Sequence, residues 1–231
     1  MLSSLEKKSA ALYVKDLGLI DYTQAYRIQK EAREDVIEGG VNTLLLCEHL
    51  PVFTLGRMDT GKNFMIPEQE IIARGVKIIP VDRGGEVTLH CPGQLVIYPI
   101  FNLLRFGKDL KSFLNKLEQV AIDLLRDFDI LATGISGQRG VWVDRKKIVS
   151  IGIGVRKWVS FHGMSINVQP DLKLFSMIRP CGLDVQMTSI KALRGNEVPM
   201  QEVKSKVLKH FKNIFDLEIS SPLESLAAKN S

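Results

Sequence analysis

The fold of this chain is decided by the stretch Arg83-Gly84-Gly85-Glu86-Val87-Thr88-Leu89-His90-Cys91-Pro92-Gly93-Gln94-Leu95-Val96-Ile97-Tyr98-Pro99-Ile100-Phe101. It joins an arginine and a glycine pair to a strand-like run, a histidine, a Cys-Pro-Gly turn and a second apolar strand. Glycines let a ligand approach the backbone closely, and Arg83 and His90 stand at the two ends of the first strand. We therefore expect a ligand site on these strands. The simpler interpretation is a hairpin whose glycines only form turns.

Charge and cysteine content argue against several classes of protein. The chain has 31 basic and 26 acidic residues, a net charge of +5, with no dense Lys/Arg block. This modest excess favours acidic protein partners over nucleic acid. The cysteines Cys47, Cys91 and Cys181 are odd in number and lack metal-ligand spacing, which is typical of a reducing compartment. No apolar signal core or bilayer-length stretch is present. The sequence predicts a cytoplasmic protein with no membrane association, metal site or cofactor.

Helical and strand patterns alternate along the chain without an internal repeat. Helices are expected over about 21–38, 67–75, 108–128 and 199–215, and strands over 43–47, 52–55, 76–81, 140–144, 148–155 and 158–168. The clearest helix carries one apolar stripe at the helical period, made of Leu110, Phe113, Leu114, Leu117, Val120, Ala121, Leu124 and Leu125. We predict one mixed α/β (α+β) domain over residues 1–220, rich in hairpins, and a flexible tail over 221–231.

Three short segments outside the opening stretch carry candidate chemistry. Cys181 lies between a proline and a glycine beside Arg179, and positive charge favours its thiolate; the alternative is an inert small hydrophobe. Lys147 begins an apolar strand and is either a surface charge or the partner of a nucleophile. His162 is either a satisfied polar residue between strands or a group that faces a ligand. Cys47, within an apolar run, is expected to be inert.

Together these segments resemble the octanoyltransferases, also called lipoyl(octanoyl) transferases or lipoate-protein ligase B. The resemblance runs from Thr43 to about Ser189. It is carried, in the family's order, by Glu48-His49, Phe53-Thr54-Leu55-Gly56-Arg57, most of residues 83–99, Gly140-Val141-Trp142-Val143, residues 147–152, His162-Gly163, Asn167-Val168 and Pro180-Cys181-Gly182.

The resemblance implies both a fold and a reaction. The fold is that of lipoate and biotin protein ligases, a mixed sheet with flanking helices. The reaction moves an octanoyl group from octanoyl-acyl carrier protein to a lysine of lipoyl domains, in 2-oxoacid dehydrogenase complexes and the glycine cleavage H protein. Cys181 matches the cysteine that carries the acyl thioester, and Lys147 the lysine that lowers its pKa. The substrate site is expected at Arg83, Gly84, Gly85, Glu86, Val87, Thr88, Leu89, His90, Ser150, Ile151, Gly152, Gly163, Met164 and Ser165.

Departures from the family pattern bear on the shape of the acyl pocket. Cys91 stands where the family usually has glycine, Val149 replaces a smaller residue, and Met164-Ser165 replaces a Leu-Ala-like pair. Two alternatives remain. An ATP-using lipoate or biotin ligase shares the fold, but adenylation needs no cysteine and so leaves the Pro-Cys-Gly element unexplained. The other is a non-catalytic or hydrolytic protein, such as a cysteine thioesterase.

Overall fold

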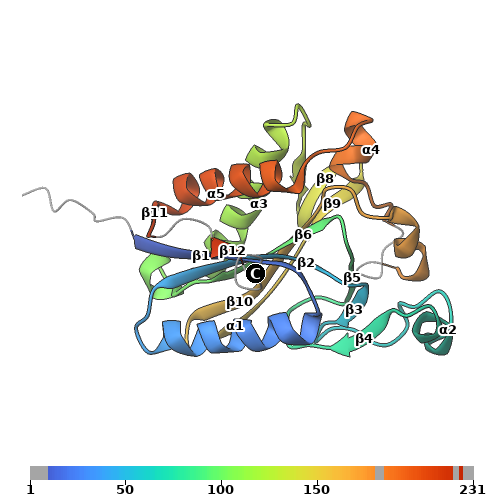
Figure 1. Cartoon of the computed structure of the whole chain (residues 1–231), viewed down its shortest axis with the longest axis horizontal. Helices are drawn as coiled ribbons and strands as arrows, with labels where there is room; N and C mark the ends of the chain where they lie inside the picture. Colours follow the sequence, from blue (N-terminus) through green and yellow to red (C-terminus); the bar gives the residue numbers. More distant parts are fainter. Residues whose placement is uncertain (1–9, 180–184, 221–223, 226–231) are drawn as a thin grey trace, which may run out of the picture.

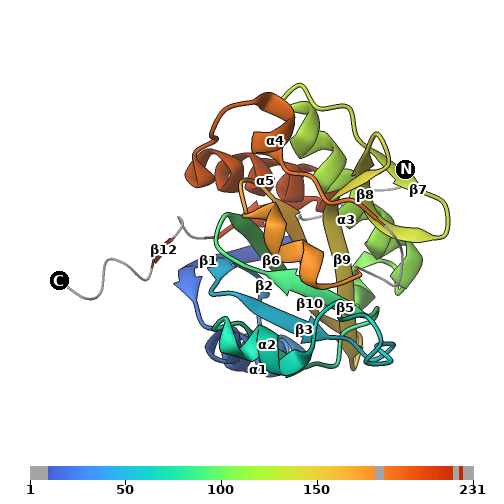
Figure 2. The same cartoon turned by 90° about the vertical axis from the view of Figure 1, so that its right-hand side faces the viewer.

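The computed structural model describes residues 10–179, 185–220 and 224–225, which form a large mixed sheet between helices on both of its faces (Figure 1). Helix α1 (Tyr22–Ile37) covers one face, and helices α3 (Leu110–Arg126) and α5 (Met200–Phe215) cover the other. The same three layers are visible in the turned view of Figure 2. The predicted mixed sheet with flanking helices is confirmed.

The large sheet has the strand order β11-β1-β2-β6-β10-β9-β8-β7, with β12 also paired to β1. Strand β1 is parallel to β2, β11 and β12, whereas the other neighbours are antiparallel. Helix α1 supplies the crossover that the parallel strands β1 and β2 require. The strands are β1 (Ala10–Ile20), β2 (Asn42–His49), β6 (Gln94–Ile100), β7 (Thr133–Ile135), β8 (Gln138–Val143), β9 (Lys146–Arg156), β10 (Val159–Asn167), β11 (Leu217–Ile219) and β12 (Glu224–Ser225).

A smaller sheet, in the order β4-β3-β5, lies beside the large one. Its strands are β3 (Val52–Leu55), β4 (Lys77–Pro80) and β5 (Val87–His90). Between β5 and β6 the amide of Gln94 donates to the Cys91 carbonyl at 3.2 Å, and Gly93 has a φ of 83°. Strand β5 pairs with β3, whereas β6 pairs with β2 and β10. The simple hairpin is therefore the wrong interpretation, because the turn carries the chain from one sheet to the other.

Successive side chains of β6 pack into two separate hydrophobic cores, one on each face of the large sheet. Leu95 and Ile97 pack toward α3 and α5, while Val96 and Tyr98 pack toward α1. Successive strand residues point to opposite faces, so a sheet covered on both sides needs the continuous apolar run seen in this sequence. Each fully buried large apolar side chain contributes about 1.5–3 kcal/mol. The two helical layers hold β6, and with it the turn at Gly93, in a fixed position.

The predicted elements agree with the structure in most places. All four predicted helices are present, the second being α2 (Glu68–Ala73), and Asp21 and Asp109 cap α1 and α3 by accepting amides of Thr23 and Ser112. Leu110 was expected to be buried but is 41% exposed, because it is the first residue after the cap of α3. Strand β1 was not predicted, nor were the short helices η1 (Leu103–Phe106), η2 (Leu172–Met177) and α4 (Ile190–Arg194).

Residues 221–223 and 226–231 of the expected tail lie outside the described residues, so that expectation stays a prediction. In the part of the chain that the structure describes, no helix is long and apolar enough to cross a membrane.

Candidate active site

A pocket of about 520 Å³, open solvent at its mouth included, lies where the small sheet meets β9 and β10 of the large one. Almost all of the expected substrate-site residues line it, together with Lys147 and four further residues. Its lining comprises Tyr22, Arg83, Gly84, Gly85, Glu86, Val87, Thr88, His90, Val96, Tyr98, Lys147, Ser150, Ile151, Gly152, His162, Gly163, Met164 and Ser165.

Leu89 is the exception among the expected residues. It is fully buried among the apolar side chains of the small sheet and α2, including Phe53 and Ile71. The neighbours Thr88 and His90 point the other way along β5 and line the pocket, because strand side chains alternate. Its expected place in the substrate site is thus corrected to a place in the core.

A β-bulge places Lys147 in the pocket. Val141 pairs with Val149, but the next residue, Trp142, pairs with Lys147, so β9 has one extra residue opposite β8. Strict alternation would put Lys147 and Ser150 on opposite faces; the bulge lets both line the pocket.

The surroundings of Lys147 enclose its side chain. The residue is 4% exposed, and its ammonium lies 5.0 Å from the centre of the Trp142 ring. A Cβ on Gly140 would lie 2.8 Å from the Lys147 Cε, so glycine makes room for the lysine there. The neighbouring Lys146 is exposed. Of the two lysines, only Lys147 is buried, which favours a functional role for Lys147 and a surface role for Lys146.

Cys181 lies outside the described residues, but the described residues before and after 180–184 are anchored beside the pocket. Before it, the Arg179 amide donates to the Asn63 carbonyl at 2.7 Å. After it, the Gln186 carbonyl accepts the amide of Lys147 at 2.8 Å, and the Thr188 amide donates to the Lys147 carbonyl at 2.9 Å. The described residues 186–188 therefore run alongside Lys147.

The two described cysteines are poor nucleophiles. Cys47 and Cys91 are both buried. Burial raises the pKa of the Cys47 thiol far above its ordinary value and that of Cys91 to about 12. Both are neutral thiols at pH 7, and only the thiolate is an effective nucleophile. Cys91 packs in the core of the small sheet.

Close backbone contacts hold the loop that contains Gly84 and Gly85, called the glycine loop below, over β9. Arg83 is buried and donates to the Thr54 carbonyl at 2.6 Å and to the Gly84 carbonyl at 3.0 Å. The Gly84 amide donates to the Ile153 carbonyl at 2.9 Å. A Cβ on Gly152 would lie 2.9 Å from the Gly84 oxygen, so a side chain there would push the loop away. Arg83 thus holds the loop, and the glycines allow it to lie directly on the strand.

His90 is held in one tautomer by a chain of amides. Its Nδ1 lies 2.7 Å from the Gln94 Oε1, and the Gln94 amide group donates to the Asn167 Oδ1 at 2.9 Å. Asn167 donates in turn to the Thr188 carbonyl at 3.0 Å. Since the Gln94 oxygen can only accept, His90 carries its proton on Nδ1. Burial lowers the pKa of His90 to about 3, with a further contribution from nearby His49, so the ring is neutral at pH 7.

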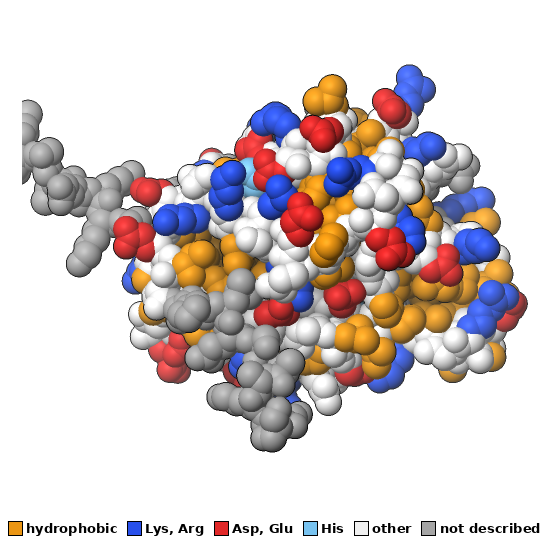
Figure 3. All heavy atoms as spheres, turned by 45° about the horizontal axis from the view of Figure 1, so that its top comes forward, with side chains coloured by type: hydrophobic (Ala, Val, Ile, Leu, Met, Phe, Trp, Pro, Cys, Tyr) orange, Lys and Arg blue, Asp and Glu red, His pale blue; other side chains and the backbone are white. Residues whose placement is uncertain are grey.

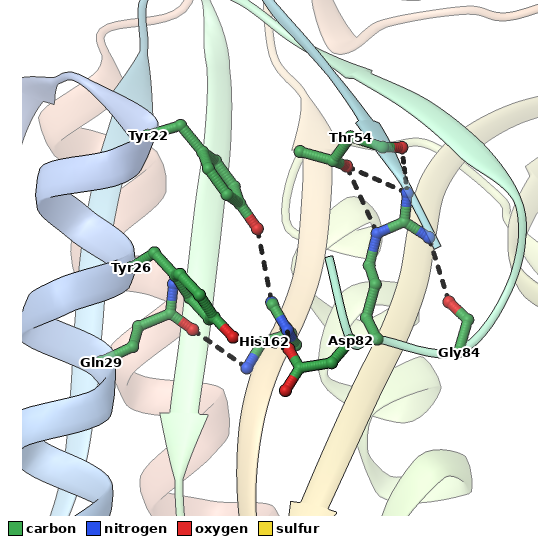
Figure 4. A network of polar contacts seen from close by, with 8 residues as sticks. Tyr22, Tyr26, Gln29, Thr54, Asp82, Gly84 and His162 are labelled. Atoms are coloured by element: carbon green, nitrogen blue, oxygen red, sulfur yellow. Dashed lines mark hydrogen bonds and ion pairs between the residues drawn. The ribbon is translucent and has the colours of Figure 1, made fainter. Parts of the chain in front are cut away.

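A second polar cluster lies at the α1 side of the pocket (Figure 4). His162 Nε2 lies 2.8 Å from the Asp82 Oδ1, which also accepts the Tyr26 hydroxyl at 2.7 Å. The Tyr22 hydroxyl lies 3.4 Å from the His162 Nδ1. Burial lowers the pKa of His162 despite the opposing effect of Asp82. His162 is therefore both a satisfied polar residue and part of the pocket.

Tyr22 was not found by sequence reasoning, because nothing local shows that the first turn of α1 reaches this pocket. The Asp21 cap was the available signal, since it fixes where the helix begins. Among the described residues, no group of three His, Cys, Asp or Glu side chains is placed to hold a metal ion. The pocket offers a mixed polar and apolar slot with a buried ammonium near one end, which suits an acyl chain with a polar reactive group.

Comparison with known proteins agrees with this geometry. Residues 21–212 match the family model for the lipoyl protein ligase A/B catalytic domain. An octanoyltransferase of Nitratidesulfovibrio vulgaris is 43% identical over 87% of this chain and 93% of its own, and one of Geobacter sp. is 41% identical over 89% and 98%.

Solved structures support the fold. A lipoate-protein ligase A bound with ATP superposes with a TM-score of 0.70 at 12% identity, over 94% of this chain and 89% of the other. A bipartite lipoate protein ligase from Thermoplasma acidophilum gives a TM-score of 0.68 at 13% identity, over 95% and 87%. The expected ligase-like fold is confirmed. By sequence, the chain belongs to the octanoyltransferases, a family of acyltransferase enzymes built on the lipoyl protein ligase A/B catalytic domain.

Proposed function

We propose that this enzyme transfers an octanoyl group from octanoyl-acyl carrier protein to the target lysine of lipoyl domains through a thioester on Cys181. The acceptors are the lipoyl domains of 2-oxoacid dehydrogenase complexes and the glycine cleavage H protein, and the reaction takes place in the cytoplasm. The observation that carries the proposal is the buried Lys147, which lines the pocket and bonds through its backbone to Gln186 and Thr188, a few positions after Cys181 in the sequence.

Lys147 provides the charge that a cysteine nucleophile needs. A free thiol of pKa about 8.5 is only about 3% ionised at pH 7. An ammonium about 4 Å from a thiolate attracts it by about 4 kcal/mol at an effective dielectric constant of about 20, before the desolvation cost. Half of that attraction lowers the pKa of such a thiol to about 7, so that about half of it is ionised at pH 7.

The first step of the proposed mechanism forms the acyl-enzyme. The Cys181 thiolate attacks the thioester carbonyl of the octanoyl carrier, and the bond between that carbon and the carrier sulfur breaks. The departing sulfur takes a proton from the Lys147 ammonium and leaves as a thiol. Two steps through a covalent intermediate replace one difficult transfer.

In the second step, a neutral lysine amine of the lipoyl domain attacks the octanoyl-Cys181 thioester. The amide bond forms, the bond to the Cys181 sulfur breaks, and the attacking nitrogen passes its proton to the neutral Lys147 amine. The enzyme returns to its thiolate and ammonium forms, so that Cys181 and Lys147 titrate as a pair.

The proposal is tested by incubating the enzyme with octanoyl-acyl carrier protein and a purified lipoyl domain, with ATP omitted. We expect a gain of one octanoyl group on the lipoyl domain, detected by mass spectrometry, at the same rate with or without ATP. Transfer only from free octanoate and ATP would identify a ligase, the alternative that shares this fold. Release of free octanoate without acceptor modification would identify a thioesterase.

A further inference from the structure

We infer that Tyr26, Asp82 and His162 form a wall that closes the far end of the acyl pocket and sets the longest acyl chain the enzyme accepts. The inference rests on the proposed function, because it concerns the substrate of the same site. Together these three residues are called the end wall below.

The end wall stands between two cavities. On its inner side, Tyr22 and His162 line the acyl pocket. On its outer side, Tyr26 and Asp82 line a second, more open cavity of about 690 Å³, open solvent included. The His162 side chain is 2% exposed and the Asp82 side chain 47% exposed, so the imidazole is the inner layer and the carboxylate the outer one.

The end wall is rigid because each of its parts is held by hydrogen bonds. Asp82 accepts from both His162 and Tyr26, and the His162 and Tyr26 rings stack at 5.4 Å with an interplanar angle of 12°. The His162 amide donates to the Gln29 side chain of α1 at 3.0 Å. Figure 4 shows these groups converging from α1, β10 and the segment before the glycine loop.

The backbone of His162 is also strained. Its φ is +54°, in the left-handed region that costs a non-glycine residue roughly 1–2 kcal/mol. Strain of this kind persists only where surrounding contacts impose it, and it is concentrated at functional sites. Here it occurs in the middle of β10 and directs the imidazole toward Tyr22, Tyr26 and Asp82.

The position of the end wall matches the length of an octanoyl chain. His162 is the register partner of Ile153 on β9, and β9 advances about 10 Å from Ser150 to Ile153. A fully extended octanoyl chain is about 9 Å long, since its seven carbon–carbon bonds of about 1.5 Å form a zigzag that advances about 1.3 Å per bond. The Gly84 amide bonds to the Ile153 carbonyl at this same level, so the glycine loop closes over the strand there. A chain whose carbonyl lies near Ser150 therefore ends at His162.

A longer chain meets two obstacles at this point. It has to displace the imidazole, which breaks the hydrogen bond to Asp82 and the stacking on the Tyr26 ring. Beyond the end wall it enters a cavity lined by Lys30, Arg33, Arg57 and Arg156, where methylene groups gain little burial.

The test compares kcat/KM for octanoyl, decanoyl and dodecanoyl carrier proteins in the wild type and in His162→Gly. Glycine removes the imidazole and suits the positive φ. We expect the ratio of dodecanoyl to octanoyl kcat/KM to rise about tenfold or more, because the space left by the imidazole can bury methylene groups for which the wild-type pocket has no room. Tyr26→Ala removes the ring that stacks on His162, so we expect it to raise the same ratio by a smaller factor. If His162→Gly does not fold, Tyr26→Ala serves as the test.

The matched control is His210→Ala, which breaks another His–Asp pair of the same length, 2.8 Å to Asp127, at the α5 layer. Its chain-length ratio should equal that of the wild type. An unchanged ratio in both end-wall variants that still transfer octanoyl groups overturns the inference, as does an equal rise in His210→Ala. A wild type that transfers no octanoyl group refutes the proposed function instead. In that case, calorimetric binding of octanoate and dodecanoate to the same variants still tests the end wall, with the same change in preference expected.

Discussion

Lys147 is the single residue on which the chemistry most depends. If its ammonium holds Cys181 as a thiolate, Lys147→Met should raise the pKa of the thiol toward its free value. Alkylation by iodoacetamide at pH 7 should then slow about tenfold, and much of that loss should return at pH 9 as the thiol ionises unaided. Overall octanoyl transfer should fall further, because the second step also loses its proton acceptor.

Lys146→Met is the matched control, because Lys146 is exposed and Lys147 is buried. It should show the wild-type dependence of alkylation rate on pH. An unaltered profile in Lys147→Met would refute the pairing with Cys181 and leave the lysine a packing role.

Two buried histidines make the folded state sensitive to acid. Burial lowers the pKa of His49 to about 4 and that of His90 to about 3. As the pH falls below about 6.5, the unfolded chain binds these protons before the folded chain does. Stability that is fully present above pH 6.5 is therefore lost progressively down to about pH 4 and pH 3. We expect the free energy of unfolding to drop by about 2–4 kcal/mol between pH 7 and pH 5, measured by urea denaturation.

His49→Gln and His90→Gln separate the two contributions. Each should reduce the slope of stability against pH by about a third to a half, whatever it does to stability at pH 7, because His162, whose pKa burial also lowers, contributes to the same slope. A slope that neither substitution changes would assign the acid sensitivity to other groups.

At the scale of elements, the contact between β6 and β10 depends on a glycine. A Cβ on Gly163 would lie 2.0 Å from the Ile97 carbonyl oxygen and 2.7 Å from the Pro99 ring. Gly163→Ala should therefore destabilise the fold by about 2–3 kcal/mol and reduce acyl transfer, since the residue also lines the pocket. Thermal unfolding measures the first effect and kcat/KM the second.

Gly134→Ala provides the comparison, because Gly134 is also a strand glycine without a positive φ. A Cβ added to Gly134 would have the Glu118 Oε2 as its nearest atom, at 3.9 Å, which is an ordinary contact. That substitution should stay within about 0.5 kcal/mol of the wild type. Equal effects of the two substitutions would contradict the steric explanation.

The elements that sequence reasoning found are those whose pattern is local. In helix α3 and in most strands of the large sheet, the spacing of the apolar residues is visible in the sequence itself. Strand β1 was missed because Lys15, Asp16 and Gly18 interrupt its apolar residues. Asp16 is buried only because it pairs with Lys204 of α5 at 2.7 Å, a contact across 188 positions of the sequence that no local pattern reveals.

The site divides in the same way. Residues in quoted motifs, such as Gly84 and Lys147, line the pocket. Tyr22 and the support of His162 by Asp82 depend on how α1 packs on the sheet, which is a tertiary effect. Leu89 was misplaced because a continuous motif was expected to act as one surface, whereas neighbouring strand residues face opposite ways.

For the whole molecule, the net charge of +5 should assist encounter with acidic carrier and lipoyl domains. Basic and acidic side chains are interspersed over the face shown in Figure 3, so that face has no broad area of one sign. We expect KM for octanoyl-acyl carrier protein to rise several-fold between about 0.02 and 0.5 M salt, as charges become screened beyond a few ångströms. A small octanoyl thioester donor should show little change. Equal salt dependence of KM for both donors would show that charge steering does not assist binding of the carrier protein.

The most direct test of the central claim is the intact mass of the enzyme after incubation with octanoyl-acyl carrier protein alone. We expect the mass to increase by one octanoyl group, which peptide mapping should place on Cys181. Adding a lipoyl domain should then remove this group from the enzyme and transfer it to the lipoyl domain. Cys181→Ala should show no increase. An octanoyl group found on Cys47 or Cys91, or transfer by Cys181→Ala at the wild-type rate, would contradict the account.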